Sequence, residues 1–211
     1  RSIVEIIDMN TFEVLHTYKL NIKEIDNLID QDNLEFKKLF NYRFRLLHPI
    51  ILNDGSLISD SNYTAMFKID FCSKLKWINQ EEAFHHSKMF DEKNNIWSPI
   101  RLFPYSDYVA KHYNVDEYRD ENGEISYKNL PYADDGIGLI DSKNGKFLFK
   151  KSVSEILAEN EIISSQLFKE HDPIHLNDIE EAFKTTKFWN KNDLFLSARN
   201  LNAIIHYRPS E

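Results

Sequence analysis

A series of short apolar stretches, separated by turns rich in Asn, Asp and Gly, constrains the fold more than any other feature of the sequence. Short stretches of Ile, Leu, Val and Phe between such turns indicate β-strands. The clearest hairpin has Asp54-Gly55 at its tip, because this dipeptide tolerates the positive φ of a tight turn. Other hairpins are predicted at residues 3–18, 65–77 and 138–149. The sequence therefore favours an all-β fold.

Two segments break the strand pattern with apolar residues at helical spacing. Residues 21–40 begin with Asn21 and Glu24, which can form a capping pair, and residues 152–168 begin with a capping box of Ser152 and Glu155. We expect two short helical insertions there. Residues 101–135 are polar, rich in Tyr and too long for an ordinary connection, so a functional loop or a disordered insertion is expected.

The strand pattern repeats in units of four strands, which begin at His48, His86 and His175. Tandem four-stranded units indicate a β-propeller, although unit length alone leaves a β-sandwich open. We expect a single partial propeller domain over residues 1–211, with about three to four blades. The predicted blades are residues 1–20 (the tail of a blade), 48–80, 86–150 and 175–211.

Each of the three histidines opens a unit. Because the first strand of a propeller blade lies nearest the axis, the side chains of His48, His86 and His175 are expected to converge on one mouth of the central channel. The alternative is that each histidine caps a strand through a backbone hydrogen bond.

The third unit carries the densest set of polar residues. Asp172, His175, Asn177 and Asp178 lie at its start, and Arg199 follows one hairpin later. If the strand that begins at His175 pairs with the strand that ends at Arg199, both residues flank the same end. Arg presents a fork of donors to a tetrahedral oxyanion, and His exchanges a proton near neutral pH. These types favour a pocket for a sulfate, phosphate or carboxylate ester; the alternative is a structural ion pair of Arg199 with Asp178 or another carboxylate.

Composition excludes several classes of protein. A net charge of −8 argues against an extended nucleic-acid contact surface, and no apolar run approaches the ~18 residues of a membrane span. The single cysteine, Cys72, excludes an internal disulfide framework and is expected to be a small core residue. His171 and His175 have a metal-like spacing, but Pro173 interrupts a helix between them, so we predict no metal site.

Several motifs carry a resemblance to a known family. They are Phe84–Ser87 with Asn95–Pro99, then Asp135–Asp141, Lys151–Leu157, Asp172–Ile179 and Asp193–Asn200. With these motifs the chain resembles the arylsulfotransferases, also called aryl-sulfate sulfotransferases, and most closely an uncharacterised branch of that family. The resemblance covers nearly the whole chain and is specific in its second half.

The resemblance implies a six-bladed propeller with the active site in its central channel. Such enzymes move a sulfuryl group from a phenolic sulfate ester to a phenol through a transient sulfo-histidine, without a metal or nucleotide cofactor. On the matching positions, it implies that His86 and His175 hold or protonate the ester and that Arg199 binds its oxygens. We add His48, from its place in the repeat, and Asn177, from the polar set, as further substrate-binding residues.

The family's nucleophilic histidine lies in a later blade, after a motif similar to Gly-Pro-Trp and then Gln-His-Asp. The chain ends at Glu211 before such a motif, so we expect that histidine outside these residues and expect residues 1–211 to be inactive by themselves. No N-terminal β-sandwich of the kind found in characterised members is visible.

By the same resemblance we expect small phenolic partners, no cofactor, and a location in the periplasm or on the outer side of a membrane. The sequence leaves the oligomeric state open. One alternative function is a non-catalytic propeller that binds a ligand or protein at the same mouth. Another is hydrolysis of an anionic ester with water as the acceptor.

Overall fold

A computed structural model describes residues 3–28, 45–114, 117, 119, 121, 123, 130–162 and 170–209. The first strands are β1 (Ile3–Ile7), β2 (Val14–Lys19), β3 (Leu47–Ile51), β4 (Leu57–Asp60), β5 (Thr64–Ile69) and β6 (Leu75–Phe84). They are followed by β7 (Met89–Phe90), β8 (Ile96–Arg101), β9 (Asp135–Ile140), β10 (Phe147–Ser152), β11 (Leu176–Glu181), β12 (Leu194–Ala198) and β13 (Ala203–Tyr207). The described helices are α1 (Ile22–Leu28), α2 (Asp107–Ala110) and α3 (Val153–Glu159).

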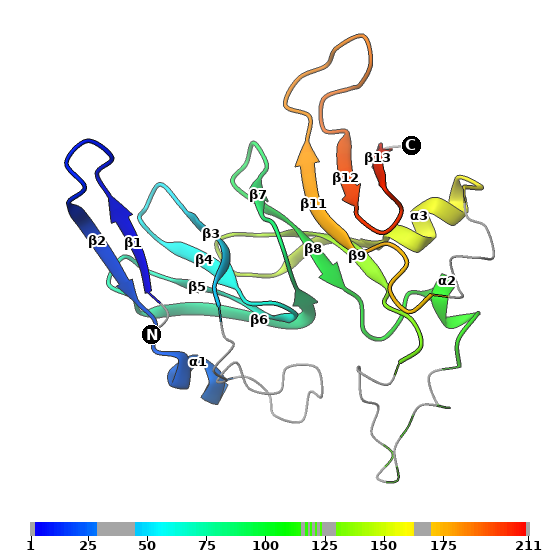
Figure 1. The fold of residues 1–211 in the computed structure, drawn as a ribbon, viewed down its shortest axis with the longest axis horizontal. Coiled ribbons are helices and arrows are strands. Elements are labelled where there is room, and N and C mark those ends of the chain that lie inside the picture. The colour runs from blue at the N-terminus through cyan, green and yellow to red at the C-terminus, as the bar shows by residue number, and fades with distance from the viewer. Residues whose placement is uncertain are drawn as a thin grey trace.

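The strands form antiparallel sheets, which follow one another in chain order from left to right in Figure 1. Strands β1 and β2 form a hairpin, β3 to β10 form an eight-stranded sheet, and β11 to β13 form a three-stranded sheet. The four hairpins predicted from the sequence are all present. The all-β prediction is confirmed, while no sheet closes into a ring within the described part of the chain.

The eight-stranded sheet consists of two antiparallel meanders, β3–β6 and β7–β10. Strand pairing joins them where β6 pairs with β8, through Ala83 with Arg101 and Phe84 with Ile100. This junction places Arg101, the last residue of β8, beside the end of β6.

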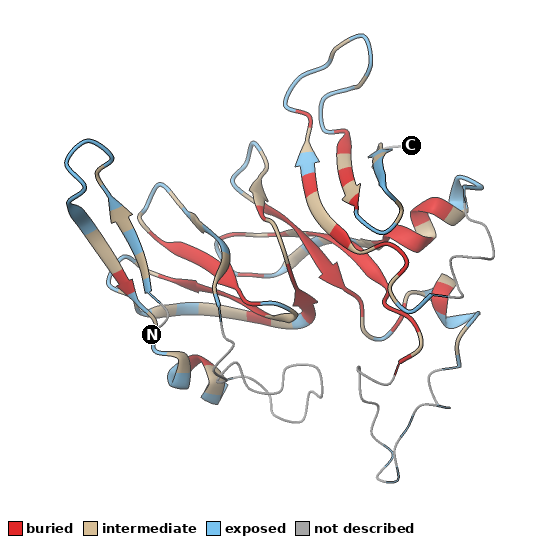
Figure 2. Ribbon diagram, viewed as in Figure 1, coloured by how far each residue is buried: buried red, intermediate tan, exposed pale blue. Residues whose placement is uncertain are grey.

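The central strands of both meanders are buried on both faces, as the red ribbons of Figure 2 show. Successive strand residues point to opposite faces. In β4, Leu57 therefore packs with Tyr18 toward the β1–β2 hairpin, while Ile58 packs with Ile100 toward the second meander. In β8, Trp97 packs in turn toward Leu196 of the third sheet. Three core layers thus separate four successive sets of strands.

The helices begin where the capping residues predict. The backbone N–H of Glu24 donates to Asn21 Oδ1 (3.3 Å), and that of Glu155 donates to Ser152 Oγ (3.3 Å). Helix α3 ends at Glu159, earlier than predicted, and is followed by a turn. Helix α1 is described to Leu28, and the rest of the predicted segment, within residues 29–44, lies outside the described residues, as do residues 163–169. None of the described helices has the length and apolar character needed to cross a membrane.

The segment between β8 and β9 packs as a small unit in its described part. Tyr105 and Val109 of the α2 region form a cluster with Leu130 and Tyr132. The remaining residues of the expected loop, 115–116, 118, 120, 122 and 124–129, lie outside the described residues.

The prediction that Cys72 is a core residue is wrong, because the side chain is exposed. Cys72 lies in the tight turn between β5 and β6, where the backbone N–H of Ser73 donates to the carbonyl of Asp70 (2.8 Å). A residue at the tip of a hairpin extends beyond the layers that pack on the sheet.

Candidate functional site

The three histidines that open the repeated units share an uncommon backbone conformation. His48, His86 and His175 have φ values of 40°, 60° and 49°. Few residues other than Gly adopt positive φ, and three equivalent occurrences point to one structural role. The chain turns at each histidine as it enters β3, β7 or β11.

His86 and His175 lie in contact. Their Nε2 atoms are 3.2 Å apart, and their ring centroids are separated by 5.2 Å. The contact arises because β7 and β11 lie side by side: the Ser87 N–H donates to the Asn177 carbonyl (3.4 Å). The structure thus brings together two histidines that are far apart in sequence.

The remaining predicted histidine, His48, is exposed. Burial raises the pKa of Asp60, and the charges of Lys88 and His48 are close enough to oppose that rise. His48 therefore lies near the buried Asp60–Lys88 pair.

Asp172 fixes the orientation of His175. Its Oδ2 lies 2.6 Å from His175 Nδ1, and since a carboxylate only accepts, Nδ1 carries the hydrogen. The other ring nitrogen, Nε2, then faces His86. Asp172 Oδ1 in turn accepts from Arg101 Nη2 (3.1 Å).

Arg101 is buried between two carboxylates. Its Nε and Nη2 both donate to Asp135 Oδ1 (3.1 and 3.0 Å), while the ring of Tyr63 lies 4.5 Å from the guanidinium carbon. Burial by itself would raise the pKa of Asp135, but its contacts with His85, Arg101 and the Leu176 N–H outweigh that effect and lower the pKa to about 2. Asp135 is therefore an anion at neutral pH. We call Asp135, Arg101 and Asp172 the carboxylate–arginine network.

His86 is neutral at neutral pH. Its partial burial, together with the nearby charges of His85, His175 and Arg199, lowers its pKa to about 4. His85 is fully buried behind it, with Nε2 3.5 Å from Asp135 Oδ1. A neutral His86 has one N–H to offer, either to His175 or to an oxygen of a bound ligand.

Arg199 flanks the pair as the strand pairing required. Strand β11 pairs with β12, and the Arg199 N–H donates to the His175 carbonyl (3.1 Å). Its side chain is exposed, and Nε donates to Asn200 Oδ1 (3.1 Å). Among the described residues, Arg199 forms no ion pair with Asp178 or another carboxylate. The guanidinium therefore keeps donors for an anion.

Asn177 lies on β11 just after His175 and is half-buried. Its backbone carbonyl accepts the Ser87 N–H (3.4 Å), and a role of its side chain in substrate binding stays a prediction. The described residues contain no group of three or more His, Cys, Asp or Glu side chains arranged to hold a metal ion.

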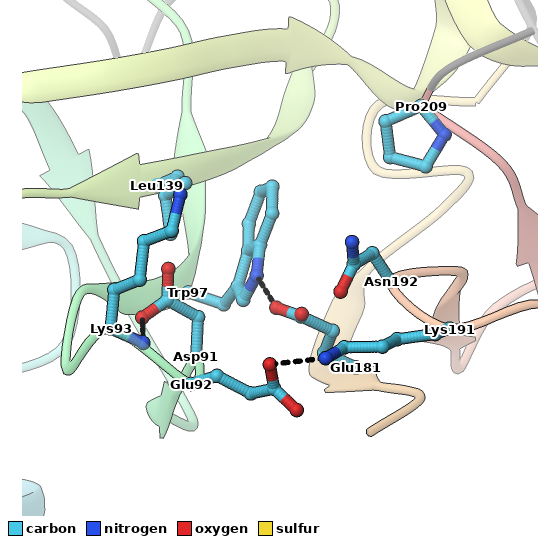
Figure 3. A pocket seen from close by; sticks show the side chains of 9 residues that line it. All are labelled: Asp91, Glu92, Lys93, Trp97, Leu139, Glu181, Lys191, Asn192 and Pro209. Carbon is cyan, nitrogen blue, oxygen red and sulfur yellow. Dashed lines mark hydrogen bonds and ion pairs between the residues drawn. The ribbon is translucent and has the colours of Figure 1, made fainter. Parts of the chain in front are cut away.

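A pocket of about 530 Å³ lies at the other end of β7 and β11 (Figure 3). Glu181, at the far end of β11 from His175, accepts from Trp97 Nε1 (2.6 Å), and Lys191 pairs with Glu92 (2.5 Å). Six residues of strand span about 20 Å. None of the predicted site residues lines this pocket, which is bounded by Asp91, Glu92, Lys93, Trp97, Leu139, Glu181, Lys191, Asn192 and Pro209.

Sequence reasoning missed most of the carboxylate–arginine network. It noted Asp172 without giving it a task, and it assigned none to Arg101, Asp135 or Tyr63. One signal was available: Arg101 and Asp135 are charged residues in strands that are otherwise mostly apolar and nearly all buried. A charge in such a strand is paired in nearly every case.

A family model described as Arylsulfotransferase (ASST) matches residues 53–211. The match takes in His86, His175, Arg199 and the whole network, and His48 lies before it. A search of curated proteins finds no match. With the greater part of its length covered by this family model, the chain belongs to the arylsulfotransferase family.

Proposed function

We propose that this protein transfers a sulfuryl group from a phenolic sulfate ester to a phenol, with His86, His175 and Arg199 forming the donor site. The observation that carries the proposal is the contact between the Nε2 atoms of His86 and His175 (3.2 Å), with Asp172 behind His175 and Arg199 beside it. Family membership supports the same substrate class.

The residue types fit the charge changes of this reaction. As the S–O bond of the donor breaks, negative charge gathers on the leaving phenolate oxygen and stays on the sulfuryl oxygens. We assign proton donation to the phenolate to the Nε2–H of protonated His175, which becomes neutral in this step, and binding of the sulfuryl oxygens to Arg199 and the His86 N–H. Preorganised donors of this kind lower the barrier because they need no reorganisation during the reaction.

In this proposal the sulfuryl group passes first to a histidine of a later blade. The resulting sulfo-histidine then gives it to the acceptor phenol, whose proton returns to His175. Splitting the transfer into two steps replaces one difficult displacement with two easier ones.

We further propose that the four successive sets of strands (β1–β2, β3–β6, β7–β10 and β11–β13) are successive blades of a β-propeller. Three features support this: the sheets stack face to face in chain order, each unit begins with a positive-φ histidine, and β7 and β11 are adjacent. In a propeller these are the strands nearest the axis. His86 and His175 would then face the central channel.

The test is turnover of 4-nitrophenyl sulfate, with and without added phenol, by the full-length protein that includes the later blade with the expected nucleophilic histidine. We expect release of 4-nitrophenol only with phenol present, and a loss of about 10²–10⁴ in kcat/KM for His175→Asn. His171→Asn is the matched control, because His171 is exposed and its side chain has no hydrogen-bond or ion-pair partner among the described residues. Release without phenol would indicate a hydrolase, and no release from folded protein would indicate a non-catalytic binding module; either outcome overturns the proposal.

A further inference from the structure

The carboxylate–arginine network ends on His175. Asp135 binds Arg101, Arg101 binds Asp172, and Asp172 binds the ring nitrogen of His175 that faces away from His86. From this geometry we propose that Asp172 is a positioning residue, which fixes the tautomer of His175. Arg101 holds the Asp172 side chain in place, because its Nη2 binds one carboxylate oxygen and leaves the other oxygen to face the His175 ring. The proposal deepens the function proposed above, because it concerns the same site.

Both oxygens of Asp172 are committed. Oδ1 accepts from Arg101 Nη2 (3.1 Å), and Oδ2 accepts from His175 Nδ1 (2.6 Å). The backbone is held as well, since the Asp172 carbonyl accepts from Asn200 Nδ2 (2.5 Å). The side chain is 25 % exposed and lies in a loop, so these contacts, rather than packing, fix its position.

Arg101 is held more firmly than Asp172. Its side chain is 5 % exposed, it donates twice to Asp135, and the Tyr63 ring covers it. Asp135 is fully buried and accepts the backbone N–H of Leu176 (2.8 Å), the residue after His175. The network therefore reaches the chain on both sides of His175, and any shift of the ring relative to Arg101 breaks one of these bonds.

This arrangement has a definite chemical consequence. A neutral imidazole carries one hydrogen, and the partner of one nitrogen decides the state of the other. With Nδ1–H bound to Asp172, Nε2 presents a lone pair that takes the proton of the acceptor phenol and later returns it to a leaving phenolate. The two carboxylates and one guanidinium leave a net charge of −1 beside the ring. This negative charge stabilises the imidazolium of His175, which exists between the step that takes the proton and the step that returns it. The Asp of a Ser-His-Asp triad has the same two roles: it fixes the tautomer of the His and stabilises the imidazolium.

The first measurement uses the unaltered protein. Ring ¹⁵N spectra of histidine-labelled protein, with His175 assigned through His175→Gln, are expected to show the hydrogen of neutral His175 on Nδ1. A hydrogen found on Nε2 instead overturns the proposal without any further variant.

The second measurement uses Asp172→Asn. Because Arg101 only donates, the amide oxygen must face Arg101 and the amide NH₂ must face His175 Nδ1. We expect the hydrogen of His175 to move to Nε2, with a fall of about 10²–10⁴ in kcat and little change in KM for 4-nitrophenyl sulfate. Asp178→Asn is the control, because Asp178 lies on the strand that follows His175 and its side chain forms no hydrogen bond to the His175 ring, and it is expected to change neither readout.

The outcomes separate the two proposals. An unchanged tautomer or an unchanged kcat in folded Asp172→Asn overturns the role of Asp172 while leaving sulfuryl transfer in place. The expected tautomer in a folded protein that shows no turnover refutes the proposed function and supports the role of Asp172 in orienting His175.

Discussion

Aspartate side chains build most of the hairpin turns of this protein. Asp8, Asp70, Asp91 and Asp141 each open a turn and accept backbone N–H groups of that turn at their Oδ1 atoms. In each turn a residue with positive φ then donates its N–H to the aspartate carbonyl; these residues are Phe12, Ser73, Asn94 and Gly145. Because the carboxylate satisfies the turn, a non-Gly residue is tolerated at three of the four positions.

Gly145 is the exception, and substitution there is expected to be costly. A Cβ atom would lie 2.6 Å from Trp77 Cε3. Neither side can move freely, because the Trp77 indole donates to the Ser142 carbonyl (3.2 Å) and the Gly145 carbonyl accepts from Asn79 (2.6 Å). We expect Gly145→Ala to lower the free energy of unfolding by about 2–4 kcal/mol, measured by urea denaturation.

Gly123→Ala is the matched control for that measurement. Gly123 also has a positive φ (79°), but no heavy atom of the described residues lies within 4 Å of its Cβ position. Only the backbone strain of a residue with a Cβ at positive φ remains, and it is expected to lower the free energy of unfolding by about 1–2 kcal/mol. Equal losses in the two variants would show that Trp77 moves aside.

At the level of the elements, α1 and α3 begin with the same kind of cap in different surroundings. Asn21 caps α1 in an exposed position. Ser152 caps α3 where it is fully buried, and it also donates to Asp134 Oδ1 (2.6 Å). Burial raises the pKa of Asp134 to about 6 despite the hydrogen bonds from Ser152 and Ser106. The buried cap therefore serves a carboxylate as well as a helix.

The two caps are expected to differ in their contribution to stability. Asn21→Ala removes a helix cap and is expected to lower the free energy of unfolding by about 1 kcal/mol. Ser152→Ala also leaves the buried Asp134 with an unmet acceptor, which adds about 1–3 kcal/mol. Thermal and urea unfolding of both variants measure the difference. Equal losses would mean that water or another group replaces Ser152 at Asp134.

The sequence predicts local structure here and misses what lies between elements. The hairpins and both helix starts were predictable, since a turn dipeptide or a cap acts within a few residues. The Arg101–Asp172 pair joins residues 71 positions apart, and no local pattern indicates it. The sequence also places the three histidines only approximately relative to the strands that they open, because strand pairing depends on distant residues. The first strand-paired residue after the histidine differs between the units: Ile50 lies two residues after His48, Met89 three after His86, and Leu176 one after His175.

At the scale of the whole molecule, polar contacts as well as apolar layers hold the meanders β3–β6 and β7–β10 together. The two meanders share only two paired positions between β6 and β8. Lys88, just before β7, adds a polar link to the first meander: its Nζ donates to Asp60 Oδ1 (2.8 Å) and to the Leu47 carbonyl (3.0 Å). The side chains of Lys88 and Asp60 are fully buried.

Removing Lys88 is expected to destabilise the stack strongly. Lys88→Met leaves Asp60 buried without its cation, and this is expected to lower the free energy of unfolding by about 3–5 kcal/mol near neutral pH. In the double variant Asp60→Asn/Lys88→Met, most of that loss is expected to return, because the uncompensated charge is gone. The exposed pair Lys191–Glu92 is the control, and Lys191→Met should cost less than about 1 kcal/mol.

The pH dependence separates a buried charge from lost packing. Burial already raises the pKa of Asp60 in the presence of Lys88, and loss of that cation raises it further. A carboxyl whose pKa is higher in the folded than in the unfolded state contributes stability at low pH that is lost as the pH rises through the folded pKa. The deficit of Lys88→Met should therefore be smaller near pH 5 than near pH 7.5 in urea denaturation, because protonation neutralises Asp60. An equal deficit at both pH values would assign the loss to packing of the lysine stem, and the link between the meanders would then be steric rather than electrostatic.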